Sequence, residues 1–223
     1  MNSKRYLLVL IIILLIAFGL PLSSTASQSS TDGGFRVITL SDSGSDLADS
    51  VAFSPDGAWL AVGTSSGVAV FDSQNLSRKY FFQVGAWARS VTFSPDGQTI
   101  AAGLFDGTVR FWRFADGQET WRQTVHDGWV RTVAFSPDGR LFAATADDDT
   151  VRLWTVATGS LALAIPNLTG ARVLAFSPDG QILAVGLQDT NIQLLNVSDG
   201  SLLRTLHGHK DWVRSLAFSP DGQ

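Results

Sequence analysis

The chain has no cysteine, so neither a disulfide framework nor a cysteine-liganded metal site is available to it. It has only three histidines, and no acidic cluster accompanies them, so the sequence predicts no metal and no cofactor. Long runs of one charge are also missing. Apolar residues make up 45% of the chain and charged residues 16%, which describes a globular chain rather than a disordered one.

Basic charge is scarce as well. Without Lys4 and Arg5, which belong to an N-terminal apolar segment, the chain has 14 basic residues against 20 acidic ones, a net charge of −6. Nucleic-acid binding needs a basic stripe that neutralises phosphates, and the sequence shows none. We therefore expect no nucleic-acid partner.

The apolar run over residues 6–20 has 15 residues, fewer than the roughly 18 to 20 that normally cross a bilayer. It follows Lys4 and Arg5, and small residues come after it at the −3 and −1 positions of a cleavage site. This plan predicts a signal peptide over residues 1–26 and a linker over 27–34, with an uncleaved membrane anchor as the alternative. Because basic residues before such a run stay inside, both predictions place the remainder outside the cytoplasm, secreted, periplasmic or on the cell surface.

In contrast to these absences, one pentapeptide is abundant. Phe-Ser-Pro-Asp-Gly occurs five times, and successive copies lie 40, 42, 41 and 42 residues apart. Pro fixes φ, Asp bonds local backbone and Gly allows a positive φ, so the motif specifies a tight turn. A period of about 40 to 45 residues is typical of repeat architectures in which each unit needs neighbours to bury its apolar face. The copies begin at Phe53, Phe93, Phe135, Phe176 and Phe218.

Each period contains four short apolar segments that favour strands. In the third unit they are residues 129–136, 141–145, 150–156 and 160–165, separated by turns rich in Asp, Gly and Thr. Four consecutive antiparallel strands per repeat make one propeller blade. The sequence therefore predicts an all-β fold of propeller blades.

The third segment of two units ends in tryptophan. Thr-Val-Arg-Phe-Trp112 and Thr-Val-Arg-Leu-Trp154 each place the Trp six residues after an aspartate, Asp106 or Asp148. Here residues 35–223 resemble the tryptophan-aspartate (WD) repeat family. The resemblance implies a hydrogen-bond network in each blade that joins a His, a Ser or Thr, this Asp and the Trp, with a structural role.

The match to that network is uneven. The third unit has His126 with Asp148 and Trp154, but Ala144 stands where the Ser or Thr is expected. The fourth has Leu195 in place of Trp, and the first has no matching Asp. The structural residues implied by the resemblance are His126, Asp106, Trp112, Asp148, Trp154, Asp189 and His209.

The predicted propeller is incomplete. Blades start near residues 47, 87, 129, 170 and 212, and the fifth has only its first strand before Gln223. Residues 35–40 resemble 201–206, the fourth, outer strand of a blade, so an N-terminal outer strand also lacks its blade. Because propellers avoid exposed edges by closure, we expect a C-terminally truncated segment of a longer protein; self-association of an open fan is the alternative.

A second periodic pattern precedes each turn motif. Arginine stands four residues before the repeat Phe in the second to fifth units, and tryptophan stands six residues before it in three of these units. Arg and Trp are enriched at binding hot spots, which suggests a partner surface. In the alternative, the Trp rings cover the ends of adjacent blades and the Arg side chains pair with turn carboxylates such as Asp106 and Asp148. The candidate partner-binding residues are Trp87, Arg89, Trp129, Arg131, Arg172, Trp212 and Arg214.

No catalytic residue is predicted. Residues 63–67 match the Gly-x-Ser-x-Gly pattern of hydrolases, but they occupy a turn between two strands rather than the strand-to-helix elbow that this chemistry needs. We expect a non-enzymatic scaffold that binds a protein or peptide on the loop face around the channel, outside the cytoplasm. The alternative is a sensor or ligand-binding propeller attached to a missing effector or catalytic domain.

Overall fold

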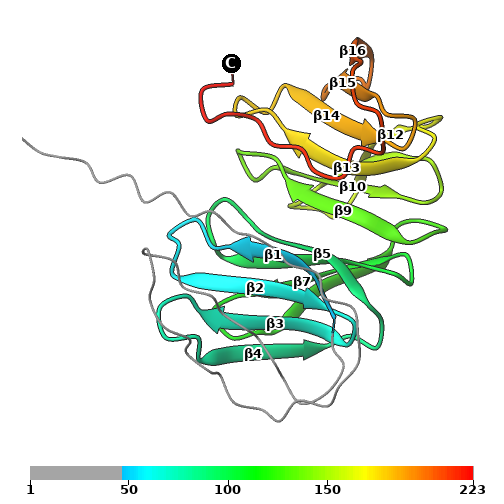
Figure 1. Ribbon diagram of the computed structural model, residues 1–223. Helices are drawn as coiled ribbons and strands as arrows, with labels where there is room; N and C mark the ends of the chain where they lie inside the picture. The colour runs from blue at the N-terminus through cyan, green and yellow to red at the C-terminus, as the bar shows by residue number, and fades with distance from the viewer. Residues whose placement is uncertain (1–46, 223) are drawn as a thin grey trace, which may run out of the picture. The chain divides into compact units, whose positions relative to one another are not determined.

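Residues 47–222 are described by a computed structural model, and they form an all-β fold without any helix (Figure 1). Sixteen strands make four four-stranded antiparallel sheets, and each sheet takes its strands in chain order. The predicted incomplete propeller of four-stranded blades is thus confirmed, and the four sheets do not close into a ring. None of the described segments is a helix with the length and hydropathy needed to cross a bilayer.

Each blade corresponds to one sequence period. The first contains β1 (Ala48–Phe53), β2 (Trp59–Thr64), β3 (Gly67–Asp72) and β4 (Arg78–Gln83). The second contains β5 (Ala88–Phe93), β6 (Thr99–Leu104), β7 (Thr108–Arg113) and β8 (Glu119–Thr124). The third contains β9 (Val130–Phe135), β10 (Leu141–Ala146), β11 (Val151–Thr155) and β12 (Leu161–Ile165). The fourth contains β13 (Ala171–Phe176), β14 (Ile182–Leu187), β15 (Ile192–Asn196) and β16 (Leu202–Leu206).

The repeated pentapeptide closes the hairpin between the first two strands of every blade. In the first blade, Ser54 Oγ donates to Asp56 Oδ1 at 2.5 Å and accepts from the backbone N–H of Trp59 at 2.9 Å. Gly57 has a φ of 71° and donates to the carbonyl of Ser54 at 2.8 Å. Because all of these bonds lie within six residues, the turn forms wherever the motif occurs.

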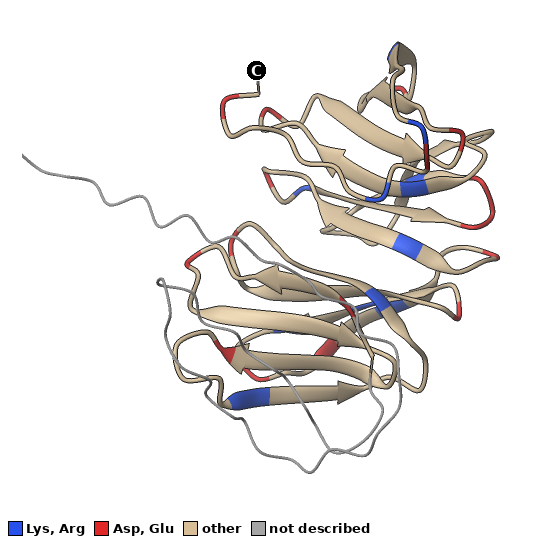
Figure 2. Cartoon of the chain, in the orientation of Figure 1, with Lys and Arg blue, Asp and Glu red and all other residues tan. Residues whose placement is uncertain are grey.

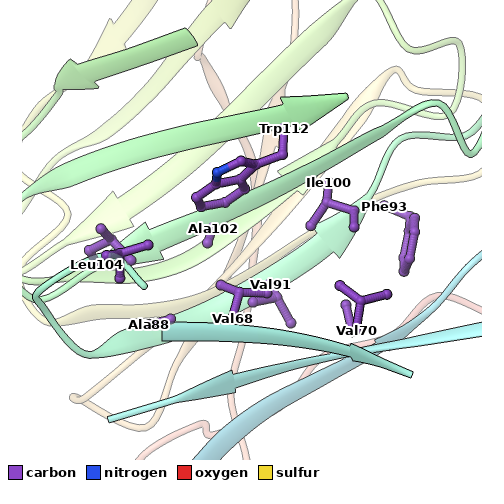
Figure 3. Close-up of a cluster of buried hydrophobic side chains, with 11 residues drawn as sticks. Val68, Val70, Ala88, Val91, Phe93, Ile100, Ala102, Leu104 and Trp112 are labelled. Carbon is purple, nitrogen blue, oxygen red and sulfur yellow. The ribbon is translucent and has the colours of Figure 1, made fainter. Parts of the chain in front are cut away.

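The apolar core lies between neighbouring blades. The second strand of each sheet is buried over five of its six residues, whereas the fourth strands are mostly exposed. First strands of successive blades pack side by side, so they form the inner edge of the arrangement. Figure 3 shows the cluster between the first two blades, where side chains of β3, β5, β6 and β7 gather around Val91 and Ile100.

One glycine position sets how closely the blades approach. A Cβ placed on Gly103 of β6 would lie 2.4 Å from Cγ1 of Val130 in the next blade, which is far inside normal contact. Gly186 of β14 meets Val213 in the same way, at 2.6 Å. The third blade has the buried Thr145 at this position, and the residue that corresponds to Val130 in the following blade is the smaller Ala171. A larger residue at the one position thus goes with a smaller one at the other in the third and fourth blades, whereas Gly63 of the first blade faces the backbone of Ala88.

The fifth copy of the motif folds as a turn but not as part of a sheet. Val213 is buried and donates its N–H to the carbonyl of Leu187 at 3.2 Å, and Gly222 donates to Ser219 as in the other turns. Residues 212–218, predicted to be the first strand of a fifth blade, nevertheless have no strand structure. A first strand pairs with the second strand of its own blade, and residues 47–222 contain no such partner for this segment. The predicted signal peptide, linker and N-terminal outer strand lie outside the described residues.

Candidate functional site

The His, Asp and Trp predicted for the third blade do meet. His126 is 2% exposed, and its Nδ1 lies 2.9 Å from Asp148 Oδ2, while the ring stands edge-on to Trp154 at 5.9 Å. Because a carboxylate only accepts hydrogen bonds, Nδ1 carries the proton and donates. Nε2 is buried and has no hydrogen-bond partner within the described chain, and Ala144 stands where the resemblance implies a hydroxyl residue.

The charges of this network follow from burial. Burial lowers the pKa of His126 below its ordinary value of 6.5, although the hydrogen bond and charge of Asp148 oppose this, so the imidazole is neutral near pH 7. Burial raises the pKa of Asp148, but hydrogen bonds from Thr150 and His126 outweigh it, and the net pKa lies below 3.8. A buried, neutral His126 therefore donates a hydrogen bond to the ionised carboxylate of Asp148.

Two members of this network were missed from the sequence. Thr150 Oγ1 donates to Asp148 Oδ1 at 2.7 Å, and Arg152 Nη2 lies 3.5 Å from Asp148 Oδ2 while Nη1 donates to the carbonyl of Val125. The signal was present in the shared Thr-Val-Arg segment, because Arg110 occupies the same place in the second blade and donates to a backbone carbonyl there too.

The other residues that the resemblance marked as structural are more scattered. Asp106 is exposed and accepts from Thr108 within its own turn, and Asp189 accepts only from Asn191 among the described residues. Trp112 is 3% exposed and stacks on Phe82 at 4.8 Å. His209, the counterpart of His126 before the fifth motif, is exposed.

The periodic arginines occupy one distinctive backbone position. Asp49, Arg89, Arg131 and Arg172 are each the extra residue of a β-bulge near the start of a first strand, with no counterpart on the second strand. A bulge turns a side chain away from the alternation of the sheet, which explains why these charged residues escape the core. Figure 2 shows a basic segment in each of β5, β9 and β13, whereas acidic segments lie mostly in turns.

The arginines have different partners. Arg131 makes two hydrogen bonds to Asp147, from Nε at 2.6 Å and from Nη2 at 2.5 Å, and Arg89 pairs with Asp49 at 3.1 Å. Arg172 donates to the amide oxygen of Gln188, in the amide orientation that satisfies both groups. The alternative in which the arginines pair with turn carboxylates holds for Arg131, although its partner is Asp147 and not the adjacent Asp148. Arg89 instead pairs with Asp49, which lies in β1.

Positive charge accumulates around Arg172. Burial and repulsion from Arg131 lower the pKa of Arg172, although Asp147 opposes them, and Arg89 and Arg214 act in the same direction as Arg131. Four guanidinium groups therefore lie near this end of the blades, and two of them are paired with carboxylates, Arg89 with Asp49 and Arg131 with Asp147. Arg214 is exposed and has no carboxylate partner within residues 47–222.

Tryptophan rings accompany these arginines. Phe105 stacks on Trp129 with ring centroids 4.4 Å apart and planes 3° from parallel, and Phe105 also contacts the tilted ring of Trp87 at 5.0 Å. Trp129 is 47% exposed and carries Arg131 over its ring at 4.9 Å. Phe105 was missed from the sequence; it holds the place after the second strand that Asp147 and Gln188 hold in the next blades.

The same pairing of cation and ring recurs at the fifth motif. Trp212 is 45% exposed, with Arg172 at 4.9 Å and Arg214 at 5.6 Å from its ring centroid. All seven candidate residues thus lie near the start of a first strand or, for Trp212 and Arg214, in the corresponding segment of the fifth repeat. We call this surface the Arg/Trp face; it consists of Trp87, Arg89, Trp129, Arg131, Arg172, Trp212 and Arg214.

Comparison with known protein families agrees with this architecture. The family model described as WD domain, G-beta repeat, matches residues 29–72, 81–113 and 117–155, and the model described as anaphase-promoting complex subunit 4 WD40 domain matches residues 167–221. No curated protein matches the chain. WD repeats generally mediate protein–protein interaction and scaffolding, and they are typically not enzymes. With these matches over more than half of its length, the chain belongs to the WD-repeat family.

Proposed function

We propose that this chain is a non-enzymatic scaffold that binds a protein or peptide partner outside the cytoplasm through its Arg/Trp face. The observation that carries the proposal is the exposure of Trp129 and Trp212, each close to half exposed while held beneath an arginine. A large aromatic ring at the surface leaves apolar area in contact with water, and a partner that covers the ring removes this area from water. Trp and Arg are also the residues that dominate measured binding hot spots.

The rings are held in place before any partner arrives. Trp129 is fixed between Phe105 and Arg131, and Arg131 is itself fixed by two bonds to Asp147. Ordering a free side chain on binding costs about 0.5–1.5 kcal/mol, and here that cost is met in the folded state. The Arg/Trp face is therefore suited to recognition with little rearrangement.

The location is supported by the N-terminal sequence. Lys4 and Arg5 before the apolar run of residues 6–20 support export, either by a cleaved signal peptide or through a retained membrane anchor. Fusing alkaline phosphatase, which becomes active only after export, behind residue 46 tests this. Activity that disappears when residues 6–20 are deleted supports export, and a fusion with the intact N-terminal segment that is produced but inactive contradicts it.

Site-specific photocrosslinking tests the binding surface. A benzoyl-phenylalanine is placed at Trp129 or Trp212, with Leu161 as the control, because Leu161 is 55% exposed but lies on an outer strand. We expect the same partner to be crosslinked from positions 129 and 212, and not from 161, in the cells that produce the protein. Replacing Arg131 and Arg214 together by Ala should then abolish capture. Equal capture from all three positions, or capture that survives the double substitution in a folded chain, refutes this surface.

A further inference from the structure

The ammonium of a lysine contacts three aromatic rings at the opposite end of the strands from the Arg/Trp face. The ammonium of Lys79 lies 4.3 Å from the ring centroid of Phe114, 4.5 Å from that of Trp59 and 5.3 Å from that of Tyr80. The rings are steeply inclined to one another, at 62° for Trp59 and Phe114 and 85° for Tyr80 and Phe114. Three π-systems therefore converge on one cation, and we call Trp59, Tyr80 and Phe114 the aromatic cage.

Two neighbouring blades build the cage. Trp59 begins β2 and Tyr80 lies on β4 of the first blade, while Phe114 directly follows β7 of the second. The Tyr80 hydroxyl donates to the carbonyl of Ala115 at 3.1 Å, and Phe114 also packs edge-on against Phe93 at 5.7 Å. Hydrogen bonding and packing therefore hold these rings independently of the lysine.

A β-bulge points Lys79 into the cage. Arg78 pairs with Phe71 and Tyr80 pairs with Val70, which leaves Lys79 as the extra residue of β4. The other outer strands have the same bulge, at Thr120, Ala162 and Leu203. The bulge is thus part of the repeat, whereas a lysine in it is not.

The cage itself is also absent from the other blades. The position of Trp59 at the start of the second strand is taken by Thr99, Leu141 and Ile182 in the following blades. The position of Phe114 after the third strand is taken by Val156 and Val197 in the third and fourth. The fold packs without an aromatic box at those places, so blade packing alone does not require one.

The present occupant is weakly held. Lys79 is exposed and makes no ion pair within the described residues, so only the rings retain its ammonium. A primary ammonium is strongly hydrated, and an exposed cation–π contact recovers little of the lost hydration. Quaternary ammonium groups have no N–H to hydrate and are the cations that aromatic cages bind in recognition sites.

We propose that the aromatic cage of Trp59, Tyr80 and Phe114 is a binding site for a quaternary ammonium group, which displaces Lys79 when it enters. The lysine fills the cage in the free protein and competes with the ligand. This site lies apart from the Arg/Trp face and does not depend on the function proposed for that surface.

Substitutions borrowed from the other blades test the proposal. Titration of the whole chain with choline or tetramethylammonium, followed by tryptophan fluorescence and calorimetry, should show saturable binding, with ammonium chloride as the ionic-strength control. Lys79→Ala places the residue of the third blade in the bulge and should tighten binding about two- to fivefold by removing the competitor. Phe114→Val and Trp59→Thr, both taken from equivalent positions, should each abolish binding while leaving the circular dichroism spectrum unchanged.

Two variants decide whether the cage binds the ammonium group: Lys79→Ala, and Lys79→Ala combined with Phe114→Val. Failure of the Lys79→Ala chain to bind either cation, or equal binding by Lys79→Ala and by the Lys79→Ala, Phe114→Val double variant, overturns the proposal. Phosphatidylcholine vesicles, compared with phosphatidylglycerol vesicles, separate the sources of the group. Flotation with the first alone shows that a lipid headgroup reaches the cage, and binding of free choline without flotation assigns the cage to soluble ammonium ligands.

Discussion

Replacing Gly103 by Ala should destabilise the contact between the second and third blades. The added Cβ would lie 2.4 Å from Cγ1 of Val130 and 2.8 Å from Cγ1 of Val133, where carbon atoms normally sit about 3.5–4.0 Å apart. Val130 is fully buried and, being β-branched, has few other rotamers to adopt, so the inner strand of the third blade must move by about 1 Å. Overpacking of this kind costs about 1–3 kcal/mol.

Removing the obstructing methyl groups should rescue the substitution. Val130→Ala alone loses about 1.5–3 kcal/mol of burial, but in the Gly103→Ala background the new methyl occupies part of the vacated space. The double variant should therefore be more stable than the sum of the two single effects by at least about 1 kcal/mol. The third and fourth blades already carry the equivalent exchange, in Thr145 and Ala171.

The measurement is urea unfolding of the four chains, followed by tryptophan fluorescence. Gly103→Ala combined with Val213→Ala serves as the control, because Val213 packs against Gly186 instead. That combination should be additive within about 0.3–0.5 kcal/mol, as expected for distant sites. Additivity of Gly103→Ala with Val130→Ala would show that the glycine does not set the distance between blades, and the reasoning would be refuted.

Three other substitutions or conditions have defined outcomes. Ala144→Ser should raise the free energy of unfolding by about 1 kcal/mol, because the new hydroxyl can donate a hydrogen bond to the unpartnered Nε2 of His126. Ala143 is equally buried but faces the other side of β10, so Ala143→Ser should lower the free energy of unfolding by about 1–3 kcal/mol. A loss of stability in both variants contradicts the assigned network. Because the pKa of His126 in the folded chain lies below 6.5, the unfolded chain takes up the proton at a higher pH than the folded chain does. The contribution of His126 to stability is therefore full above about pH 6.5 and falls below it, by up to about 1.4 kcal/mol per pH unit. A His126→Gln chain should show a flatter pH dependence in thermal unfolding, and an unchanged slope would argue against burial of the neutral ring. Trp129→Ala should lower the free energy of unfolding by about 1–3 kcal/mol, because the buried half of the side chain includes its stacking contact with Phe105, and a larger loss in urea unfolding would mean that the ring is chiefly structural.

The blade architecture could be predicted because its determinants are local. Each turn is specified by a serine, a proline, an aspartate and a glycine, and its hydrogen bonds stay within six consecutive residues, so spacing alone located the hairpins. Strand pairing beyond the hairpin was less accessible. The segment after Trp212 has the sequence of a first strand, yet it forms none, because a strand is a property of two segments and not of one.

The candidate site was predictable in its members but not in their contacts. The repeat period predicted that Arg131 and Trp129 lie together. It could not predict that Arg131 bonds Asp147 while Asp148 bonds His126, because this depends on the directions in which two adjacent side chains of one turn point. The bulges at Arg89 and Arg131 were likewise invisible, since a bulge is defined by register against another strand. Phe105 and the aromatic cage arise between blades, from residues far apart in sequence.

Each of the four described blades thus has two bulge residues that pair with no residue of the neighbouring strand. One bulge lies near the start of the first strand and the other near the start of the fourth, so one unpaired side chain projects at each end of the blade. Their occupants already differ widely, from Asp49 to Arg131 on one side and from Lys79 to Leu203 on the other. Such positions can change in charge, size or aromatic character while the interior stays the same. Substitutions at these positions, natural or engineered, can therefore change both surfaces of the protein one blade at a time while the residues of the core stay the same.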